Sequence, residues 1–139
     1  MFEHRRAITI EWGDCDPAGI VYFPRYLAMF DSCTWALFTA ALGMKKAALL
    51  AQFGTVGCPM VDVRARFLIP CTFGDEVVVE SRIADLRRSS FDVQHRLLKG
   101  GALAVEGLET RVWSAADTGR PGQLKSQPIP LEVRARLGA

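Results

Sequence analysis

The sequence predicts an α+β fold in which one long helix packs against an antiparallel sheet of about five strands. One observation is the segment between Pro24 and Gly43, which contains no other glycine or proline and is apolar almost all round. Another is a series of four strand-like segments after it, joined by links of hairpin length that favour antiparallel pairing. A further strand-like segment precedes the helix, so the predicted order is β-α-(α)-β-β-β-β.

The N-terminal half contains one predicted strand and two predicted helices. Residues 7–12 alternate, with Trp12 last on the apolar face, which is typical of a half-buried strand. Pro24 suits the first position of a helix, because a proline lacks the N–H group that has no partner there, and Gly43 is a natural stop. Residues 45–53 form a short second predicted helix. Because the long helix is apolar almost all round, we expect it to be enclosed.

The C-terminal half alternates with the two-residue period of strands. The pair at residues 100–101 is a Gly-Gly hairpin signal, and Gly107 indicates a bulge in the strand that follows. A terminal helical turn is expected at residues 130–137. The four strands are predicted at residues 60–69, 76–86, 91–98 and 102–113. Because strand edges need cover, we expect an oligomer.

Length and composition restrict the classes of function. At 139 residues the chain is expected to form a single domain, residues 1–139, and 50% of its residues are hydrophobic. A formal net charge of +2 does not by itself indicate nucleic-acid binding. No stretch approaches the roughly 20 apolar residues of a membrane helix, and the N-terminus lacks the apolar core of a signal peptide. We therefore predict a cytoplasmic protein with no membrane or nucleic-acid partner.

The cysteines and histidines do not form a metal-binding pattern. None of the four cysteines lies in a Cys-x-x-Cys pair, and His4 and His95 are far apart in the sequence, so no metal site is predicted. In a reducing compartment the cysteines are interpreted as free thiols, mostly buried. His95 alternates with apolar residues and is interpreted as a hydrogen-bonded histidine within the sheet rather than a catalytic one.

The segment from Trp12 to Tyr26, WGDCDPAGIVYFPRY, carries the main functional signal. Asp14 and Asp16 lie in a turn shortly before the long helix, close to the free N–H groups and positive dipole end of its N-terminus. A carboxylate that faces such donors is suited to attack a carbonyl while the donors hold the oxyanion that forms. The residues alone allow a second interpretation equally well, in which both carboxylates only stabilise the turn or cap the helix.

The residues from 13 to 26 resemble the signature of the 4-hydroxybenzoyl-CoA thioesterase family, which has the hot-dog fold. The resemblance continues in the family's order through residues 56–61, 86–91 and 124–125, and so covers most of the chain. It implies that Asp16 is the catalytic carboxylate, acting on the thioester carbonyl as a nucleophile or activating a water. It also implies that the backbone N–H of Phe23 polarises the thioester oxygen. Asp14 is interpreted as a structural neighbour that shapes the loop.

The resemblance also implies an acyl pocket. An acid at the position of Asp31 binds a ring hydroxyl in the family, and a structural hydrogen bond to a loop is the equally weighted alternative. Cys58 stands where the family pattern has a small hydroxyl residue, and with no histidine placed near it in the motif it is not predicted to be a nucleophile. Tyr22 offers flat apolar surface for an aromatic ring. Gly19 permits a positive φ or close approach of the acyl group, although a turn role explains it equally well.

The turn at residues 87–90 is the predicted coenzyme A site. Taken alone, this turn reads as a solvated hairpin with ordinary charges. In the resembled family it holds the nucleotide phosphates, so Arg87, Arg88 and Ser89 are predicted to contact them, with Lys125 from the C-terminal segment. An arginine fork suits phosphate because it donates two parallel bonds. Ser89 stands in place of a third basic residue.

The leading prediction is an acyl-CoA thioesterase that hydrolyses an aromatic, 4-hydroxybenzoyl-like acyl-CoA. Phe23 before Pro24 favours this substrate, since relatives acting on short aliphatic thioesters tend to have a histidine there. The alternatives are a short-chain aliphatic acyl-CoA thioesterase, a non-catalytic acyl-CoA binding module, and a hydratase of the same fold. No cofactor is predicted beyond the coenzyme A of the substrate. Subunits of a homodimer are predicted to share the pocket, and a homotetramer is expected by analogy.

Overall fold

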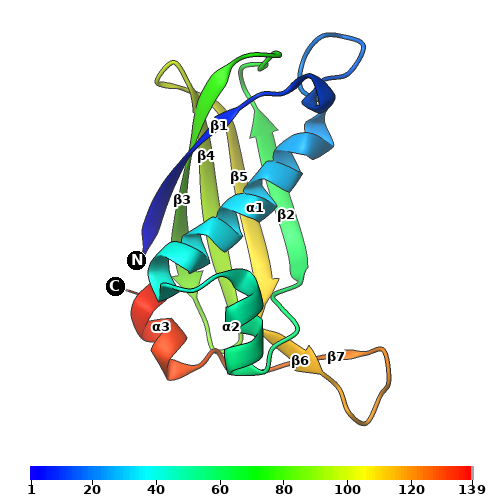
Figure 1. Ribbon diagram of the computed structural model, residues 1–139, viewed down its shortest axis with the longest axis vertical. Helices are drawn as coiled ribbons and strands as arrows, with labels where there is room; N and C mark the ends of the chain where they lie inside the picture. Colours follow the sequence, from blue (N-terminus) through cyan, green and yellow to red (C-terminus); the bar gives the residue numbers. More distant parts are fainter. Residues whose placement is uncertain (139) are drawn as a thin grey trace.

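The computed structural model describes residues 1–138, in which a five-stranded antiparallel sheet wraps around one long helix (Figure 1). The order in the sheet is β1-β3-β4-β5-β2, so β1 and β2 form its two edges. The strands span β1 Glu3–Thr9, β2 Met60–Phe67, β3 Glu76–Leu86, β4 Ser90–Lys99 and β5 Ala102–Val112. This arrangement confirms the predicted α+β class and the predicted five-stranded antiparallel sheet.

Helix α1, Phe23–Leu42, crosses the concave face of the sheet, and Gly43 ends it in the left-handed conformation with φ 70°. Pro24 is the second residue of this helix rather than the first. Helices α2, Lys46–Phe53, and α3, Leu131–Leu137, lie together at the end of the sheet where α1 finishes (Figure 1). Among residues 1–138 no single helix is long and apolar enough to cross a membrane, and α1 and α2 meet that test only when joined across a 66° bend.

The core consists of two apolar clusters along α1. Phe30 belongs to the cluster nearer the start of α1, and Phe38 to the cluster nearer its end. Thr34 lies between them in the helix and is buried among polar side chains of the sheet. The outward face of α1, including Ala28, Asp31 and Ala40, stays exposed. The helix was predicted to be enclosed, but within one chain it is covered on one side only.

Two further sequence predictions are wrong in detail, and one element was not predicted. The first strand covers Glu3–Thr9 rather than residues 7–12, and Trp12 lies in a short 3-10 turn with 77% of its surface exposed. Gly107 marks no bulge; a Cβ there would lie 2.7 Å from Cε2 of Phe30, so the glycine allows the helix to approach the sheet. A small hairpin of β6, Ser114–Ala116, and β7, Leu124–Ser126, was not predicted.

Candidate active site

The loop between β1 and α1 is closed by backbone hydrogen bonds that hold its two arms together. The N–H of Tyr22 donates to the carbonyl of Asp14 at 2.8 Å, and the N–H of Asp16 donates to the carbonyl of Ile20 at 3.0 Å. At its tip the N–H of Gly19 donates to the carbonyl of Asp16 at 2.9 Å, and Gly19 adopts a φ of 81°. These bonds hold the loop that carries Asp16 in a defined conformation at the end of the sheet where α1 begins.

The side chain of Asp14 stabilises this loop through both of its oxygens. Its side chain is buried, and one oxygen accepts from the N–H of Glu11 at 2.9 Å. The other oxygen accepts from Nε and Nη2 of Arg25 in the first turn of α1, at 3.1 and 2.9 Å. Both oxygens are occupied, and the carboxylate ties the turn to the helix, as its structural interpretation predicts.

Asp16 differs from Asp14 in the use of its oxygens. Its Oδ1 accepts from the N–H of Ala18 at 2.9 Å, which fixes the side chain in an Asx turn. Within residues 1–138 its Oδ2 has no hydrogen-bond partner, and the residue is half-buried. Asp16 therefore presents one oriented, unoccupied carboxylate oxygen.

The first turn of α1 leaves one backbone donor free. Tyr22 is the N-cap and provides no side-chain cap, and Pro24 has no N–H group. The N–H of Arg25 already donates to the carbonyl of Tyr22 at 2.8 Å. In the described part of the chain no acceptor pairs with the N–H of Phe23, which stands at the positive end of a 20-residue helix. This N–H is suited to hold a developing oxyanion.

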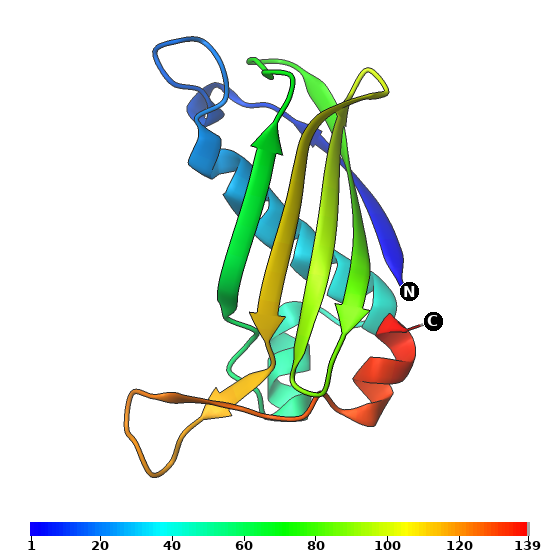
Figure 2. The same cartoon turned by 180° about the vertical axis from the view of Figure 1, so that it is seen from behind.

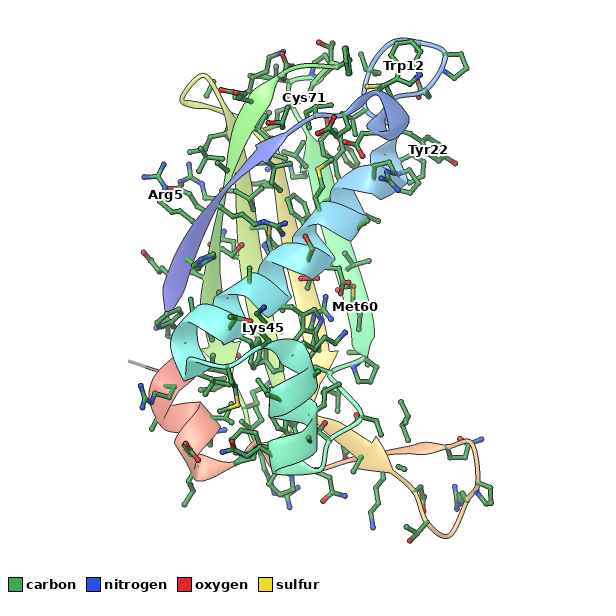
Figure 3. The ribbon with its side chains drawn as sticks, viewed as in Figure 1. Arg5, Trp12, Tyr22, Lys45, Met60 and Cys71 are labelled. Atoms are coloured by element: carbon green, nitrogen blue, oxygen red, sulfur yellow. The ribbon has the colours of Figure 1, made fainter. Side chains whose placement is uncertain are left out.

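Aromatic side chains gather around this helix start. The ring of Phe67 lies 6.3 Å from that of Phe23 and 5.7 Å from that of Tyr26, measured between centroids. Tyr22 extends outward at the same end of the molecule as Trp12 (Figure 3). Tyr22, Phe23 and Phe67 are each about half exposed, so this end offers open aromatic surface.

The two predicted acyl-pocket residues, Asp31 and Cys58, meet at Arg111 of β5. Nη2 of Arg111 lies 2.6 Å from Oδ1 of Asp31, and Nη1 donates to the carbonyl of Cys58 at 3.1 Å. Burial raises the pKa of the Cys58 thiol to about 12, despite the opposing charge of Arg111, so the thiol is a poor nucleophile. Asp31 thus contacts a strand, and not the loop that the structural alternative named.

Behind Arg111 lies a buried polar network. Glu109 contacts Nη2 of Arg111 through Oε2 at 2.7 Å, and its Oε1 lies 2.7 Å from Nε2 of His95. Thr34 of α1 donates to the same Oε1 at 2.6 Å, and Ser81 pairs with Nδ1 of His95 at 2.8 Å. His95 is fully buried and hydrogen-bonded at both nitrogens, which confirms its interpretation as a hydrogen-bonded residue of the sheet.

Charge in this network is balanced internally. Burial alone would raise the pKa of Glu109, but contacts with His95, Arg111 and Thr34 outweigh it and hold that pKa below its usual range. For Arg111 burial opposes the charge, and Glu109 and Asp31 nevertheless raise its pKa. The ionised forms of Glu109 and Arg111 therefore stabilise each other.

The predicted coenzyme A residues lie around the turn from β3 to β4. The guanidinium of Arg87 is engaged by Asp85 and Asp92, each at 2.6 Å, whereas Arg88 is exposed. The carbonyl of Ser89 accepts from the N–H of Trp113, whose own carbonyl accepts from Gln127 at 2.8 Å. This pairing places the turn beside the C-terminal segment that carries the exposed Lys125 in β7.

Within one chain the two groups of predicted site residues lie at opposite ends of the sheet (Figure 2). The Asp16 loop follows the end of β1 that pairs with Glu76 at the start of β3, while Arg87 follows the end of β3. The 11 residues of β3 correspond to roughly 35 Å. One chain therefore carries Asp16 and Phe23 at one end of the sheet and the basic turn at the other.

The sequence interpretation missed Glu109 and Arg111 as parts of the site. The sequence did contain a signal. In the two-residue alternation of the strand, Glu109 and Arg111 fall on the same face as the apolar residues Val105 and Trp113. Two charges on a buried strand face need partners, which indicates a polar network. Among residues 1–138, no three His, Cys, Asp or Glu side chains are grouped so that they could hold a metal ion.

Comparisons with known proteins agree with this geometry. A model of the thioesterase-like superfamily matches residues 10–137. The chain is 34% identical over 136 residues to the 4-hydroxybenzoyl-CoA thioesterase of Pseudomonas sp. strain CBS-3, covering 91% of this chain and 94% of that one. It is 31% identical over 97 residues to the 1,4-dihydroxy-2-naphthoyl-CoA hydrolase of Synechococcus elongatus, covering 70% and 71%.

A solved structure shows the same fold. A crystal structure of a 4-hydroxybenzoyl-CoA thioesterase mutant complexed with 4-hydroxybenzoyl-CoA superposes with a TM-score of 0.88, at 26% sequence identity over 99% of both chains. The predicted hot-dog fold and family resemblance are thereby confirmed. The chain belongs to the thioesterase-like superfamily and is a thioester hydrolase of the acyl-CoA thioesterase type.

Proposed function

We propose that this protein hydrolyses a hydroxylated aromatic acyl-CoA, of the 4-hydroxybenzoyl type, to the carboxylic acid and coenzyme A. The observation that supports the chemistry is that, in the described residues, one Asp16 oxygen and the N–H of Phe23 at the start of α1 both lack a hydrogen-bond partner. These are the two groups that acyl transfer needs, a carboxylate to attack or activate water and a donor for the oxyanion.

In the proposed mechanism the thioester oxygen lies against the N–H of Phe23. As the carbonyl becomes tetrahedral its oxygen gains negative charge, which the N–H and the α1 dipole stabilise by about 3–4 kcal/mol for one such donor. Asp16 attacks the carbonyl carbon and expels the thiolate of coenzyme A, after which water cleaves the mixed anhydride. In the second route Asp16 takes a proton from a water that attacks the carbonyl carbon directly, and the tetrahedral intermediate then expels the same thiolate. Both routes need Asp16 ionised and no cofactor beyond the substrate.

The surroundings of the site support a hydroxylated aromatic acyl group. Tyr22, Phe23 and Phe67 offer aromatic surface at the helix start, and Gly19 with its positive φ keeps the loop there free of a side chain. Asp31 offers a carboxylate as acceptor for a ring hydroxyl. Both curated relatives compared above are named for hydroxylated aromatic acyl-CoA substrates.

We propose that the working unit is a homodimer, with a tetramer as the next level of assembly. Asp16 and the predicted phosphate contacts Arg88, Ser89 and Lys125 lie too far apart in one chain for one substrate, so a second copy would complete the site. The outer edge of β2 is unpaired within the described chain, and Val61 on it is 62% exposed. Arg87 in this proposal orients the turn through its bonds to Asp85 and Asp92.

We also propose a cytoplasmic location. All four cysteines are free thiols, and three of them are buried, which suits a reducing compartment. Cell fractionation with an antibody to the native protein tests this location. Recovery in a membrane or periplasmic fraction would contradict it.

A hydrolysis screen tests the proposed substrate class. The purified protein is assayed for thiol release from 4-hydroxybenzoyl-CoA, benzoyl-CoA, phenylacetyl-CoA and acetyl-CoA. The proposal predicts the highest kcat/KM for 4-hydroxybenzoyl-CoA. A preference for acetyl-CoA would favour a short-chain thioesterase, and tight binding without release of thiol from any ester would favour a binding module.

A further inference from the structure

Arg111 is the residue that links the separate parts of the predicted acyl pocket. Its side chain is only 4% exposed, although it carries a full charge. It contacts Asp31 of α1, Glu109 of its own strand and the carbonyl of Cys58 before β2. Its Nε is buried and has no hydrogen-bond partner in the described residues. A buried charge with this many directed contacts fixes the relative positions of the groups it touches.

Asp31 is held by Arg111 and yet remains accessible. Arg111 occupies Oδ1, while Oδ2 has no hydrogen bond within residues 1–138, and 52% of the side chain is exposed. Asp31 also lines an open groove of about 680 Å³ along the outer face of α1, together with Trp35. One oxygen is fixed and the other has no partner on a half-exposed side chain, an arrangement that suits an acceptor for a hydroxyl group.

We infer that Arg111 is a positioning residue for substrate selection: it orients Asp31 so that the free oxygen accepts a hydrogen bond from a hydroxyl on the acyl ring. This inference rests on the proposed hydrolysis of hydroxylated aromatic acyl-CoA. Arg111 acts through Asp31 and touches no reacting atom, so its contribution is to the choice between ring-hydroxylated and unsubstituted substrates.

The buried network explains how Arg111 keeps this geometry. Without Glu109, the guanidinium would have Asp31 and one carbonyl as acceptors and would be free to turn toward solvent. Glu109 is itself held by His95 and Thr34, so the position of Arg111 is set from the centre of the sheet. The charged groups facing Arg111 are Asp31 from α1 and Glu109 from β5, and both contact its Nη2.

The test is a double-mutant cycle in which the measured quantity is the preference between two substrates. The ratio of kcat/KM for 4-hydroxybenzoyl-CoA to that for benzoyl-CoA is measured in wild type, R111K, D31N and the double variant. Lysine keeps the charge but lacks the fork that reaches Asp31, Glu109 and the carbonyl together. We expect the ratio to fall about tenfold or more in R111K and in D31N, since a hydrogen bond to a charged group is lost. The double variant is expected to match D31N, because Arg111 acts through Asp31.

The matched control is R136K, because Arg136 is an exposed arginine of α3 without an ion pair among the described residues. It should leave the ratio unchanged. Equal loss of kcat/KM for both substrates in R111K, or losses that multiply in the double variant, would overturn the inference. If wild type hydrolyses neither ester, the proposed function is wrong instead.

A measurement on the wild-type protein keeps the inference testable whatever the folding of the variants or the outcome of the assay. The side-chain ¹⁵N signals of Arg111 are followed by NMR during titration with 4-hydroxybenzoate and with benzoate. The inference predicts a shift on adding the hydroxylated acid that is clearly larger than the shift with benzoate. Identical shifts for the two acids would contradict it.

Discussion

At the scale of single residues, the two acids of the loop show how neighbouring, chemically identical side chains take different tasks. Both oxygens of Asp14 are bonded to the turn and to Arg25, whereas Asp16 keeps one oxygen free. The family resemblance assigned these tasks in advance, but the residue pattern alone left them equal. The difference depends on which oxygens are occupied, and spacing in a sequence does not report that.

The proposed oxyanion donor at Phe23 is a backbone group, so it is tested by removing the N–H and not the side chain. Phe23→Pro deletes that N–H at the first position of a helix, where proline is well tolerated. We expect kcat to fall about 10²–10³-fold, since one oxyanion donor is lost. Phe23→Ala is the matched variant that retains the N–H and should keep most of kcat. Steady-state kinetics compare them, and equal losses would indicate that the ring matters and the amide does not.

Glu109 makes a prediction about stability and pH. Its folded-state pKa is held below the ordinary glutamate value of 4.5, so its stabilising contribution is present above that value and is lost as the pH falls through the folded-state pKa. Glu109→Gln leaves Arg111 short of a charge partner and should cost about 3 kcal/mol at pH 7. Urea unfolding at pH 7 and pH 4 should show the difference shrinking at the lower pH.

The control for that measurement is Glu132→Gln, because Glu132 is exposed on α3. It should change stability little at either pH. A Glu109→Gln deficit that is the same at both pH values would show that the loss comes from packing, and that the charge of Glu109 contributes nothing.

At the scale of elements, periodicity predicted most of the fold. The long helix, its stop at Gly43 and the strand Glu76–Leu86 agree with the structure because apolar spacing and a helix-ending glycine are local signals. The first strand was predicted too late in the sequence, because Trp12 fits the alternation of a strand but lies in a 3-10 turn outside the sheet. The β6–β7 hairpin was missed because each of its strands has only three residues.

The role of Gly107 depends on the helix that packs against its strand, and the sequence of the strand alone does not reveal it. The glycine was interpreted as a bulge, yet its role is to admit the ring of Phe30, which stacks on His95 at 4.8 Å between centroids. Gly107→Ala should destabilise the fold by about 1–3 kcal/mol through overpacking against this buried ring. Thermal unfolding measures it. Gly13→Ala, where an added Cβ meets nothing within 4 Å, is the control and should be nearly neutral.

At the scale of the whole molecule, the single chain leaves several features incomplete. Within residues 1–138 one face of α1 is open, β2 has an unpaired edge, and the loop that carries Asp16 lies far from the basic turn. The sequence predicted an oligomer from the strand edges, and the family resemblance added a homodimer that shares the pocket. It could not predict the separation between Asp16 and Arg88, because that distance depends on the assembled sheet.

A charge on β2 tests the proposed assembly. Val63→Lys should oppose pairing of this edge with a second copy, and so give a particle near the chain mass of 15.3 kDa with much reduced hydrolysis. Light scattering after size exclusion measures the mass. Leu131→Lys, at an exposed apolar position on α3, is the control and should leave mass and activity unchanged. A fully active monomer would refute the shared site.

The proposed role of Asp16 in thioester hydrolysis is tested most directly by the effect of Asp16→Asn on hydrolysis and on binding of the same substrate. Asparagine preserves the shape of the side chain and its acceptor for the N–H of Ala18, but it can neither attack the thioester nor accept a proton from water. Stopped-flow hydrolysis of 4-hydroxybenzoyl-CoA should slow by at least about 10³-fold, while the Kd measured by calorimetry stays within a few-fold of wild type. A variant that turns over the substrate at the wild-type rate would contradict the assignment of Asp16 and the mechanism built on it.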